Sequence, residues 1–156
     1  LIENLRREID GVALRTTVIV GYPGETEQDF AELCSFVEDV EFDYVGIFPY
    51  SQEEGTLSAQ LPNQVPEDVK MERYQFLRDL ADSIGWAKVA ESIGETVQVL
   101  VEGKEGSQLY GRTCMQAPDI DGIVRLESRD SKDVTIGSYV QATISDSILY
   151  DFDGQM

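Results

Sequence analysis

The chain has 156 residues, with 30 acidic and 12 basic side chains, no histidine and two cysteines, and its formal net charge is −18. The absence of histidine excludes a histidine-based catalytic triad or metal site within these residues. Cys34 and Cys114 are too far apart in sequence to form a CxxC site or a disulfide framework. No apolar run approaches the roughly 20 residues of a membrane span, and no stretch is typical of a signal peptide. We expect a cytoplasmic protein.

The acidic charge is distributed along the whole chain. Residues 1–93 carry 19 acidic and 7 basic side chains, and residues 94–156 carry 11 and 5. Nucleic acid binds to basic patches, so it is an unfavourable partner for this composition. A basic protein would be attracted. Solubility alone is the other explanation of the charge, and composition does not separate the two.

The first elements predict an α/β arrangement. Residues 1–11 have the apolar spacing of a helix that is already under way, which indicates a piece of a longer protein. Residues 12–20 (VALRTTVIV) predict a strand buried on both faces. Thr26 and Asp29 form a weak capping box at the start of a helix over 27–40. With a second strand over 44–48, this is a βαβ unit with parallel strands.

The pattern of apolar and polar residues changes in the second half of the chain. A long loop over residues 49–65, of a length that often has a function, leads to a helix over 66–93 that Gly94 ends. After Gly94, short segments alternate apolar and polar residues and are separated by Gly, Asp and Ser. This pattern predicts a small antiparallel β-barrel. We therefore expect one domain over residues 1–93 and a second over 94–156.

The turn after the first strand is the strongest candidate for a ligand site. Glycines let the backbone approach a ligand, and the helix that follows offers amide groups at its start. Ligands lie beyond the carboxyl ends of parallel strands, so the residues after the second strand would border the same cavity. A turn that only changes the chain direction is the alternative. The residues concerned are Gly21, Tyr22, Pro23, Gly24 and Glu25 in the turn, and Tyr50 and Ser51 after the second strand.

Several motifs resemble those of the radical S-adenosylmethionine methylthiotransferases. LRTTVIVGYPGETEQDF followed by FDYVGIFPYSQEEGT resembles the end of their (βα) barrel, and residues 100–154, with YGRT and APDIDG, resemble their TRAM domain. LRTT, YSQEEGT and APDIDG favour the RimO branch, which modifies an aspartate of a small-subunit ribosomal protein. The tRNA-modifying MiaB branch typically has Arg-Pro-Gly-Thr where this chain has EEGT. The resemblance implies a partial barrel followed by an OB-like β-barrel.

The resemblance also implies cofactors. Family members use S-adenosylmethionine and two [4Fe-4S] clusters, which are held by cysteine motifs that these 156 residues lack. We expect a methylthiotransferase as the parent protein. The present chain is expected to bind no cluster or other metal, to contribute no catalytic residue and to be inactive alone.

The resemblance places the turn Gly21–Glu25 on the S-adenosylmethionine side of the barrel, and Tyr50 and Ser51 in the substrate cavity. In the TRAM part, Asp119 and Asp121 are the candidates for recognising a basic ribosomal protein. A tRNA-modifying enzyme with an RNA-binding TRAM domain and a free-standing binding module are the two alternatives.

The basic residues and the sheet edge lead to two further expectations. Arg125, Arg129 and Lys132 are the only closely spaced basic residues of 94–156, which would support weak RNA binding at best.

The incomplete barrel leaves a strand edge without a partner, so we also expect self-association there.

Overall fold

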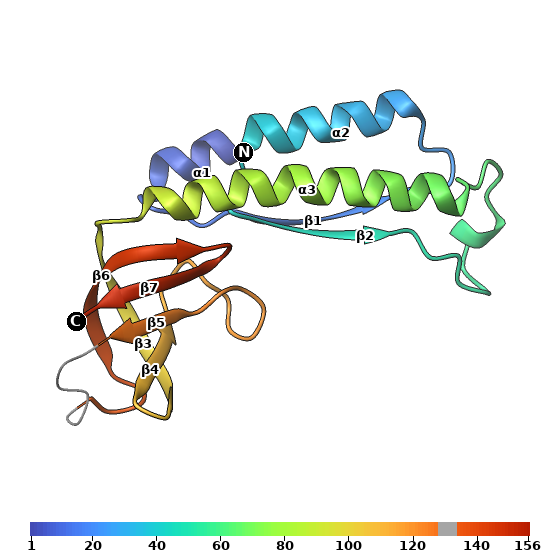
Figure 1. The fold of residues 1–156 in the computed structure, drawn as a ribbon. Coiled ribbons are helices and arrows are strands. Elements are labelled where there is room, and N and C mark those ends of the chain that lie inside the picture. The colour runs from blue at the N-terminus through green and yellow to red at the C-terminus, as the bar shows by residue number, and fades with distance from the viewer. Residues whose placement is uncertain (128–133) are drawn as a thin grey trace. The chain divides into compact units, whose positions relative to one another are not determined.

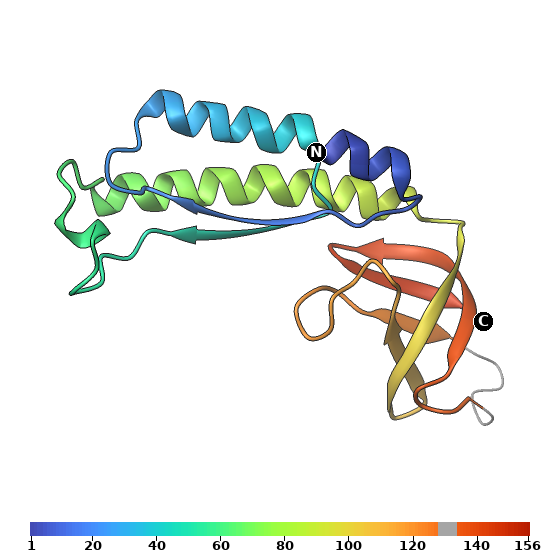
Figure 2. The same ribbon diagram turned by 180° about the vertical axis from the view of Figure 1, so that it is seen from behind.

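The computed structural model describes residues 1–127 and 134–156, and these form two compact units, Leu1–Gly85 and Trp86–Met156 (Figures 1 and 2). The helix α3 begins in the first unit and ends in the second. No helix in the described ranges has the length and apolar character that crossing a membrane requires. The first unit contains α1 (Ile2–Glu8), β1 (Arg15–Val20), α2 (Glu27–Val40), β2 (Tyr44–Pro49), a short 3-10 helix (Ser58–Gln60) and most of α3 (Glu67–Glu91).

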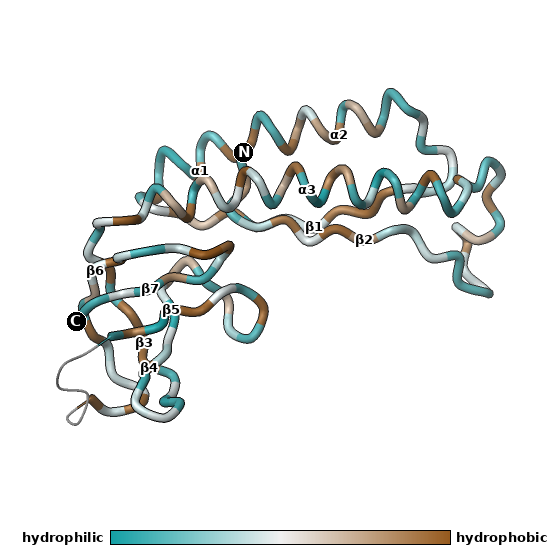
Figure 3. Tube along the Cα trace, viewed as in Figure 1, coloured by the Kyte–Doolittle hydropathy of each residue, from teal (hydrophilic) through white to brown (hydrophobic). Residues whose placement is uncertain are grey.

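In the first unit, β1 and β2 form a parallel two-stranded sheet, with Arg15 opposite Tyr44 and Val20 opposite Pro49. Figure 1 shows α2 and α3 lying side by side on one face of this sheet. The predicted βαβ unit is therefore confirmed. Apolar residues line the strands and the helix sides that face them (Figure 3). Their core consists of Val20, Cys34, Val37, Leu77 and Ala81.

Two expectations for the first strand are wrong. The strand begins at Arg15 and not at Val12, because the backbone of Leu14 bonds instead to the residues that lead into β2. The strand is also covered on one face only. Ile19 is 53% exposed and its register partner Phe48 is 58% exposed, because both helices lie on the opposite face.

The ends of α2 are fixed by side chains. Thr26 and Asp29 form the predicted capping box, and the two hydrogen bonds from the Thr26 backbone and hydroxyl to the carboxylate lower the pKa of Asp29. At the other end, the Arg6 guanidinium donates to the Val40 and Glu41 carbonyls. A cation at this position satisfies carbonyls that have no partner inside the helix. The capping residues thus join α1 and α2 within one unit.

The second unit is a closed five-stranded barrel. Its strand order is β3-β4-β5-β7-β6, and β6 returns to pair with β3. Four pairings are antiparallel, as predicted, whereas β5 and β7 pair in parallel. The strands are β3 (Thr96–Glu105), β4 (Gln108–Arg112), β5 (Val124–Glu127), β6 (Tyr139–Ile148) and β7 (Asp151–Gln155).

Alternating apolar residues of these strands fill the barrel, which matches the small OB-like architecture. Closure leaves neither edge of the barrel sheet unpaired. In the first unit, by contrast, β1 and β2 pair only with each other within the described residues. Self-association through that edge stays a prediction. The core of the barrel contains Val99, Val101, Leu109, Val124, Leu126, Ala142, Ile144 and Phe152.

Candidate functional site

The structure brings the turn after β1 and the residue after β2 together. The two strands are parallel, so both chains leave the same end of the sheet. The Tyr50 amide donates to the Val20 carbonyl at 2.9 Å. The Tyr22 and Tyr50 rings meet edge to face, with centroids 5.3 Å apart. Two segments that are far apart in sequence therefore form one surface at the carboxyl end of the strands.

The turn requires glycine at two positions. Gly21 and Gly24 have φ angles of +73° and +92°, in the region that other residues rarely adopt. A Cβ atom on Gly21 would also collide with the side chain of Lys70, which crosses the turn from α3. The conformation of the turn is thus set partly by its own residues and partly by α3.

The expectation that the turn and helix start offer free amides is wrong for most of these groups. The Gly21 amide donates to the Glu25 carboxylate at 2.9 Å, and the Gly24 amide donates to the Asn63 carbonyl at 2.9 Å. The Thr26 amide donates to the Asp29 carboxylate of the capping box. The turn therefore presents its backbone shape and the Tyr22 side chain, which is 45% exposed. It is not a ready-made anion cradle of the P-loop kind.

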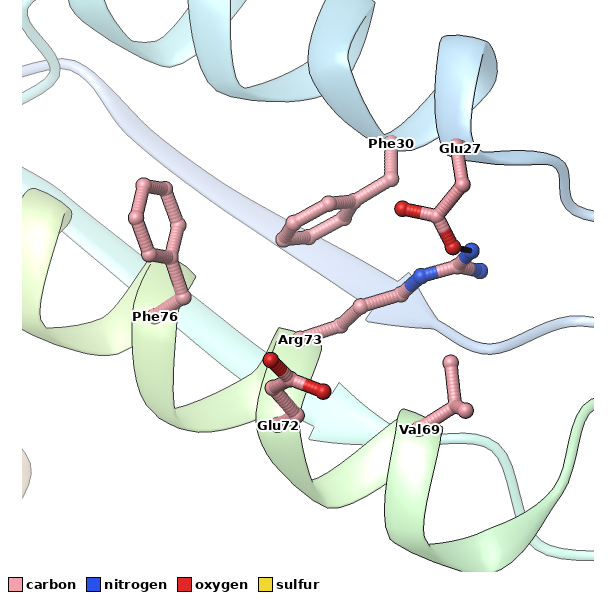
Figure 4. A pocket seen from close by; sticks show the side chains of 6 residues that line it. All are labelled: Glu27, Phe30, Val69, Glu72, Arg73 and Phe76. Carbon is pink, nitrogen blue, oxygen red and sulfur yellow. Dashed lines mark hydrogen bonds and ion pairs between the residues drawn. The ribbon is translucent and has the colours of Figure 1, made fainter.

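Arg73 of α3 holds the turn through two ion pairs, of which the one with Glu25 is buried. Its guanidinium donates to the Glu25 carboxylate at 2.6 Å and to the Glu27 carboxylate at 2.5 Å (Figure 4). The Arg73 and Glu25 side chains are 5% and 11% exposed. Burial opposes the charged form of Arg73, but the hydrogen bonds and charges of Glu27 and Glu25 outweigh it and raise the pKa of the guanidinium. Glu25 is thus engaged inside the protein, between the Gly21 amide and Arg73.

Lys70 lies one turn before Arg73 on α3 and is also buried. Its ammonium group bonds to Glu67 at 3.1 Å and lies 5.4 Å from the centre of the Tyr50 ring. The Tyr50 hydroxyl is buried and has no hydrogen-bond partner within the described part of the chain. Lys70 and Arg73 were not among the site residues predicted from the sequence. The signal was present, since both cations interrupt the apolar stripe of the helix that contains Leu77.

The structure separates Tyr50 from Ser51. Tyr50 is 7% exposed and packs inward, between Tyr22 and Lys70. Ser51 is exposed, and its hydroxyl donates to the Glu53 carboxylate at 2.6 Å. The two neighbours therefore offer different chemistry, a buried phenol and a surface hydroxyl.

In the barrel, the APDIDG turn is shaped by one of its own aspartates. The Asp121 carboxylate accepts the Ala117 amide at 2.7 Å. Asp119 is exposed and adopts a φ of +62°, and the adjacent Ile120 is 74% exposed. The turn therefore displays one carboxylate and one apolar side chain, while the second carboxylate holds its shape.

The basic residues of the barrel are partly neutralised. Arg125 pairs with Asp151, and Arg112 pairs with Glu102 at 2.7 Å. Arg129 and Lys132, the other members of the basic group named above, lie outside the described residues. The Arg125 and Arg112 pairs reduce the charge available to a phosphate backbone.

The residues present do not fit an iron–sulfur cluster. Such clusters are held by several thiolates, whereas Cys34 belongs to the core of the first unit and Cys114 to the second unit. Burial raises the pKa of the Cys34 thiol, which disfavours the thiolate form. Across residues 1–127 and 134–156, no three acidic or cysteine side chains converge as metal ligands would.

Comparisons with known proteins identify relatives over the whole chain. Residues 93–156 match the family model of the TRAM domain. The chain is 41% identical over 153 residues to a protein of Clostridium kluyveri and 46% identical over 159 residues to one of Trichlorobacter lovleyi, and these alignments cover 98% and 100% of the chain. A protein of Acaryochloris marina is 40% identical over 158 residues, again across 100% of the chain. All three relatives are named ribosomal protein uS12 methylthiotransferase RimO.

The chain spans about a third of the length of these curated relatives, with coverage of 34% to 36%. The match includes both units of the structure, and the TRAM match coincides with the closed barrel. The chain therefore belongs to the MiaB/RimO methylthiotransferase family and corresponds to the C-terminal region of its RimO branch.

Proposed function

We propose that the chain is the C-terminal region of a radical S-adenosylmethionine methylthiotransferase that modifies an aspartate of a small-subunit ribosomal protein in the cytoplasm. The observation that carries the proposal is the identity of 40% to 46% with RimO proteins across both units. The names of these relatives give uS12 as the protein that they modify. We assign residues 1–93 to the end of the catalytic barrel with its linking helix, and residues 94–156 to the TRAM domain.

In this proposal, the uncovered face of the β1–β2 sheet lines the interior of the barrel. Helices cover the outside of a (βα) barrel, and the opposite face of each strand points to its centre. This arrangement accounts for the exposure of Ile19 and Phe48, which would otherwise present apolar surface to water. The carboxyl ends of the strands, where ligands bind in such barrels, carry the Tyr22 and Tyr50 rings.

S-adenosylmethionine and the two clusters would supply the radical chemistry in the parent protein. The cysteines needed for the clusters are not among these residues. This chain contributes the rim of the cavity: Gly21–Glu25 provide its shape, Arg73 holds Glu25 in place, and Tyr50 and Ser51 border the substrate side. The proposed role of the chain is thus to shape and bind, without a catalytic residue of its own.

The TRAM domain is proposed to recognise the basic protein substrate. The charge of residues 94–156 is net −6, and the exposed pair Asp119 and Ile120 combines a carboxylate with an apolar contact. Opposite charge speeds encounter between proteins, and this effect decreases as salt screens it. The salt bridges of Arg125 and Arg112 reduce the positive charge that the domain offers to RNA.

The test is a pair of titrations of the chain 1–156, one with ribosomal protein uS12 and one with tRNA, each at low and high salt. We expect uS12 to bind and its affinity to fall with salt. Asp119→Asn should weaken this binding, whereas Asp153→Asn, which removes the same charge from β7, serves as the control. Binding of tRNA without binding of uS12 would instead support the tRNA-modifying alternative. Binding of neither would contradict a partner-recognition role of the TRAM domain.

A second experiment examines the inactivity of this region alone. Anaerobic reconstitution of residues 1–156 with iron and sulfide should yield no stoichiometric cluster, because Cys34 is buried and Cys114 belongs to the other unit. The measurement is iron per chain together with the visible absorption spectrum. A spectrum of a bound [4Fe-4S] cluster with four irons per chain would contradict the proposal.

A further inference from the structure

A small hollow lies between the first turns of α2 and α3, on the side of the first unit where the helices cover the sheet. Its volume is about 150 Å³, and it is lined by Glu27, Phe30, Val69, Glu72, Arg73 and Phe76. Sites for small molecules and cofactors usually occupy about 300–1,000 Å³. The hollow is therefore too small for a nucleotide and has the size of a single side chain.

Two aromatic rings form the apolar wall of the hollow. Phe30 from α2 and Phe76 from α3 meet edge to face, with centroids 6.0 Å apart. In Figure 4 the Phe30 ring lies between the Phe76 ring and the side chain of Arg73, which extends towards Glu27. Phe76 is 58% exposed, whereas the next residue of the helix, Leu77, is fully buried. The rings thus offer an apolar and π-rich surface that remains open to a partner.

The charge of the hollow is negative in spite of Arg73. The guanidinium of Arg73 is bonded to Glu25 and Glu27 and lies 5.4 Å from the centre of the Phe30 ring. The Arg73 side chain is only 5% exposed. It is therefore not available to an incoming anion. The Glu27 side chain is 85% exposed, and Glu72 makes no ion pair within the described residues. Two carboxylates on opposite helices therefore flank the aromatic rings.

The surroundings extend this negative field. The sequence of α2 contains five acidic residues and no basic residue. At the start of α3, Glu67, Asp68 and Glu72 are exposed, whereas Lys70 and Arg73 are buried. A positively charged partner would be drawn to this side of the first unit, and a nucleic acid would be repelled.

We propose that this hollow binds one arginine or lysine side chain of a basic protein segment. The apolar stem of such a side chain packs on Phe76 and Phe30, and its cation lies over the rings and between Glu27 and Glu72. A purely apolar side chain would bury the two carboxylates without compensation. The inference does not depend on the proposed methylthiotransferase activity, because it rests only on the surface between α2 and α3.

The test uses the chain 1–156 and a blocked peptide of alternating glycine and arginine, titrated by calorimetry at low salt. A second peptide carries citrulline, which is neutral and nearly isosteric, in place of arginine. We expect the arginine peptide to bind and to shift the NMR signals of Phe30 and Phe76, and the citrulline peptide to bind at least about fivefold more weakly.

Variants separate the hollow from the general acidity of the chain. Glu72→Gln and Phe76→Ala should each lower the affinity for the arginine peptide about two- to fivefold. Glu38→Gln removes the same charge from an exposed site of α2 outside the hollow, and should change the affinity by less than about twofold. Circular dichroism of each variant checks that the fold is kept.

Several results would overturn the proposal. They are equal affinity for the two peptides, equal losses in Glu72→Gln and Glu38→Gln, or binding of the arginine peptide without a shift at Phe30 or Phe76. A shift of the Phe30 and Phe76 signals by tRNA alone would also overturn it, since it would assign the surface to a polyanion.

Discussion

The two units bury their strands in different ways. In the barrel, every strand has two neighbours, and residues such as Leu126 and Ile144 are 1% exposed. In the first unit, the sheet is covered by helices on one face, and Ile19 on the other face is half exposed. A closed sheet supplies its own second layer, whereas an open two-stranded sheet needs neighbouring elements to cover it.

The arginine–carboxylate pairs of the two units also differ in burial. Arg73 and Glu25 are 5% and 11% exposed, whereas Arg125 and Asp151 are 37% and 30% exposed. Water screens the pair of Arg125 and Asp151, and it solvates either charge when the other is removed. A charge left behind by the buried pair of Arg73 and Glu25 would have no water to solvate it. The first unit therefore holds a buried ion pair beside its apolar core, whereas the ion pair of the barrel is open to water.

The largest expected effect is that of Arg73→Ala. The substitution leaves the Glu25 carboxylate buried without its partner, so we expect the free energy of unfolding of the first unit to fall by about 3–5 kcal/mol. Arg125→Ala in the barrel should cost at most about 1 kcal/mol. Urea unfolding, monitored in each unit by hydrogen exchange, measures both losses in free energy.

Adding Glu25→Gln to Arg73→Ala should recover part of this loss, because the buried charge is then removed as well. A cost for Arg73→Ala no greater than that for Arg125→Ala would remove the contrast between the two pairs.

Truncation of one apolar strand residue in each unit should show the reverse order. Leu126→Ala creates a cavity in the closed barrel and should cost about 2–5 kcal/mol. Ile19→Ala, on the uncovered face of β1, should change the stability by about 0.5 kcal/mol or less. Thermal unfolding by calorimetry compares the two variants. A large loss for Ile19→Ala would mean that the open face is covered in solution, for example by a second copy of the chain.

A smaller effect is expected at the start of α2. Thr26→Ala removes the hydroxyl that accepts the Asp29 amide at 3.2 Å, and should cost about 1 kcal/mol. The matched substitution in the barrel is Thr96→Ala, at an exposed position of β3, with an expected change within about 0.5 kcal/mol. Chemical unfolding of both variants checks the difference, and equal costs would argue against a stabilising cap in solution.

The smallest effect concerns pH. Hydrogen bonds from Thr26 hold the pKa of Asp29 below its ordinary value of 3.8. The contribution of this carboxylate is therefore fully present above pH 3.8 and is lost as the pH falls through the lower pKa of the folded state.

The stability difference between the unchanged chain and Asp29→Asn should accordingly shrink between about pH 5 and about pH 2. Unfolding curves at several pH values measure this trend. A difference that stays constant over the same range would show that the charge of Asp29 does not stabilise the fold.

Local patterns in the sequence determined much of this protein. The capping box at Thr26 and Asp29, the parallel βαβ unit and the short strands after Gly94 were predicted and are present. Each of these features depends on residues that are close in sequence or that repeat with the period of a helix or a strand. The glycines of the turn after β1 were identified for the same reason.

The tertiary structure alone decided which groups meet. The bond between Arg73 and Glu25 joins residues 48 positions apart, and no periodicity pairs a particular cation with a particular carboxylate. The parallel pairing of β5 with β7 and the bare face of β1 likewise depend on how whole elements are arranged. Sequence periodicity specifies which face of an element is apolar, but the packing of the other elements determines whether that face is covered.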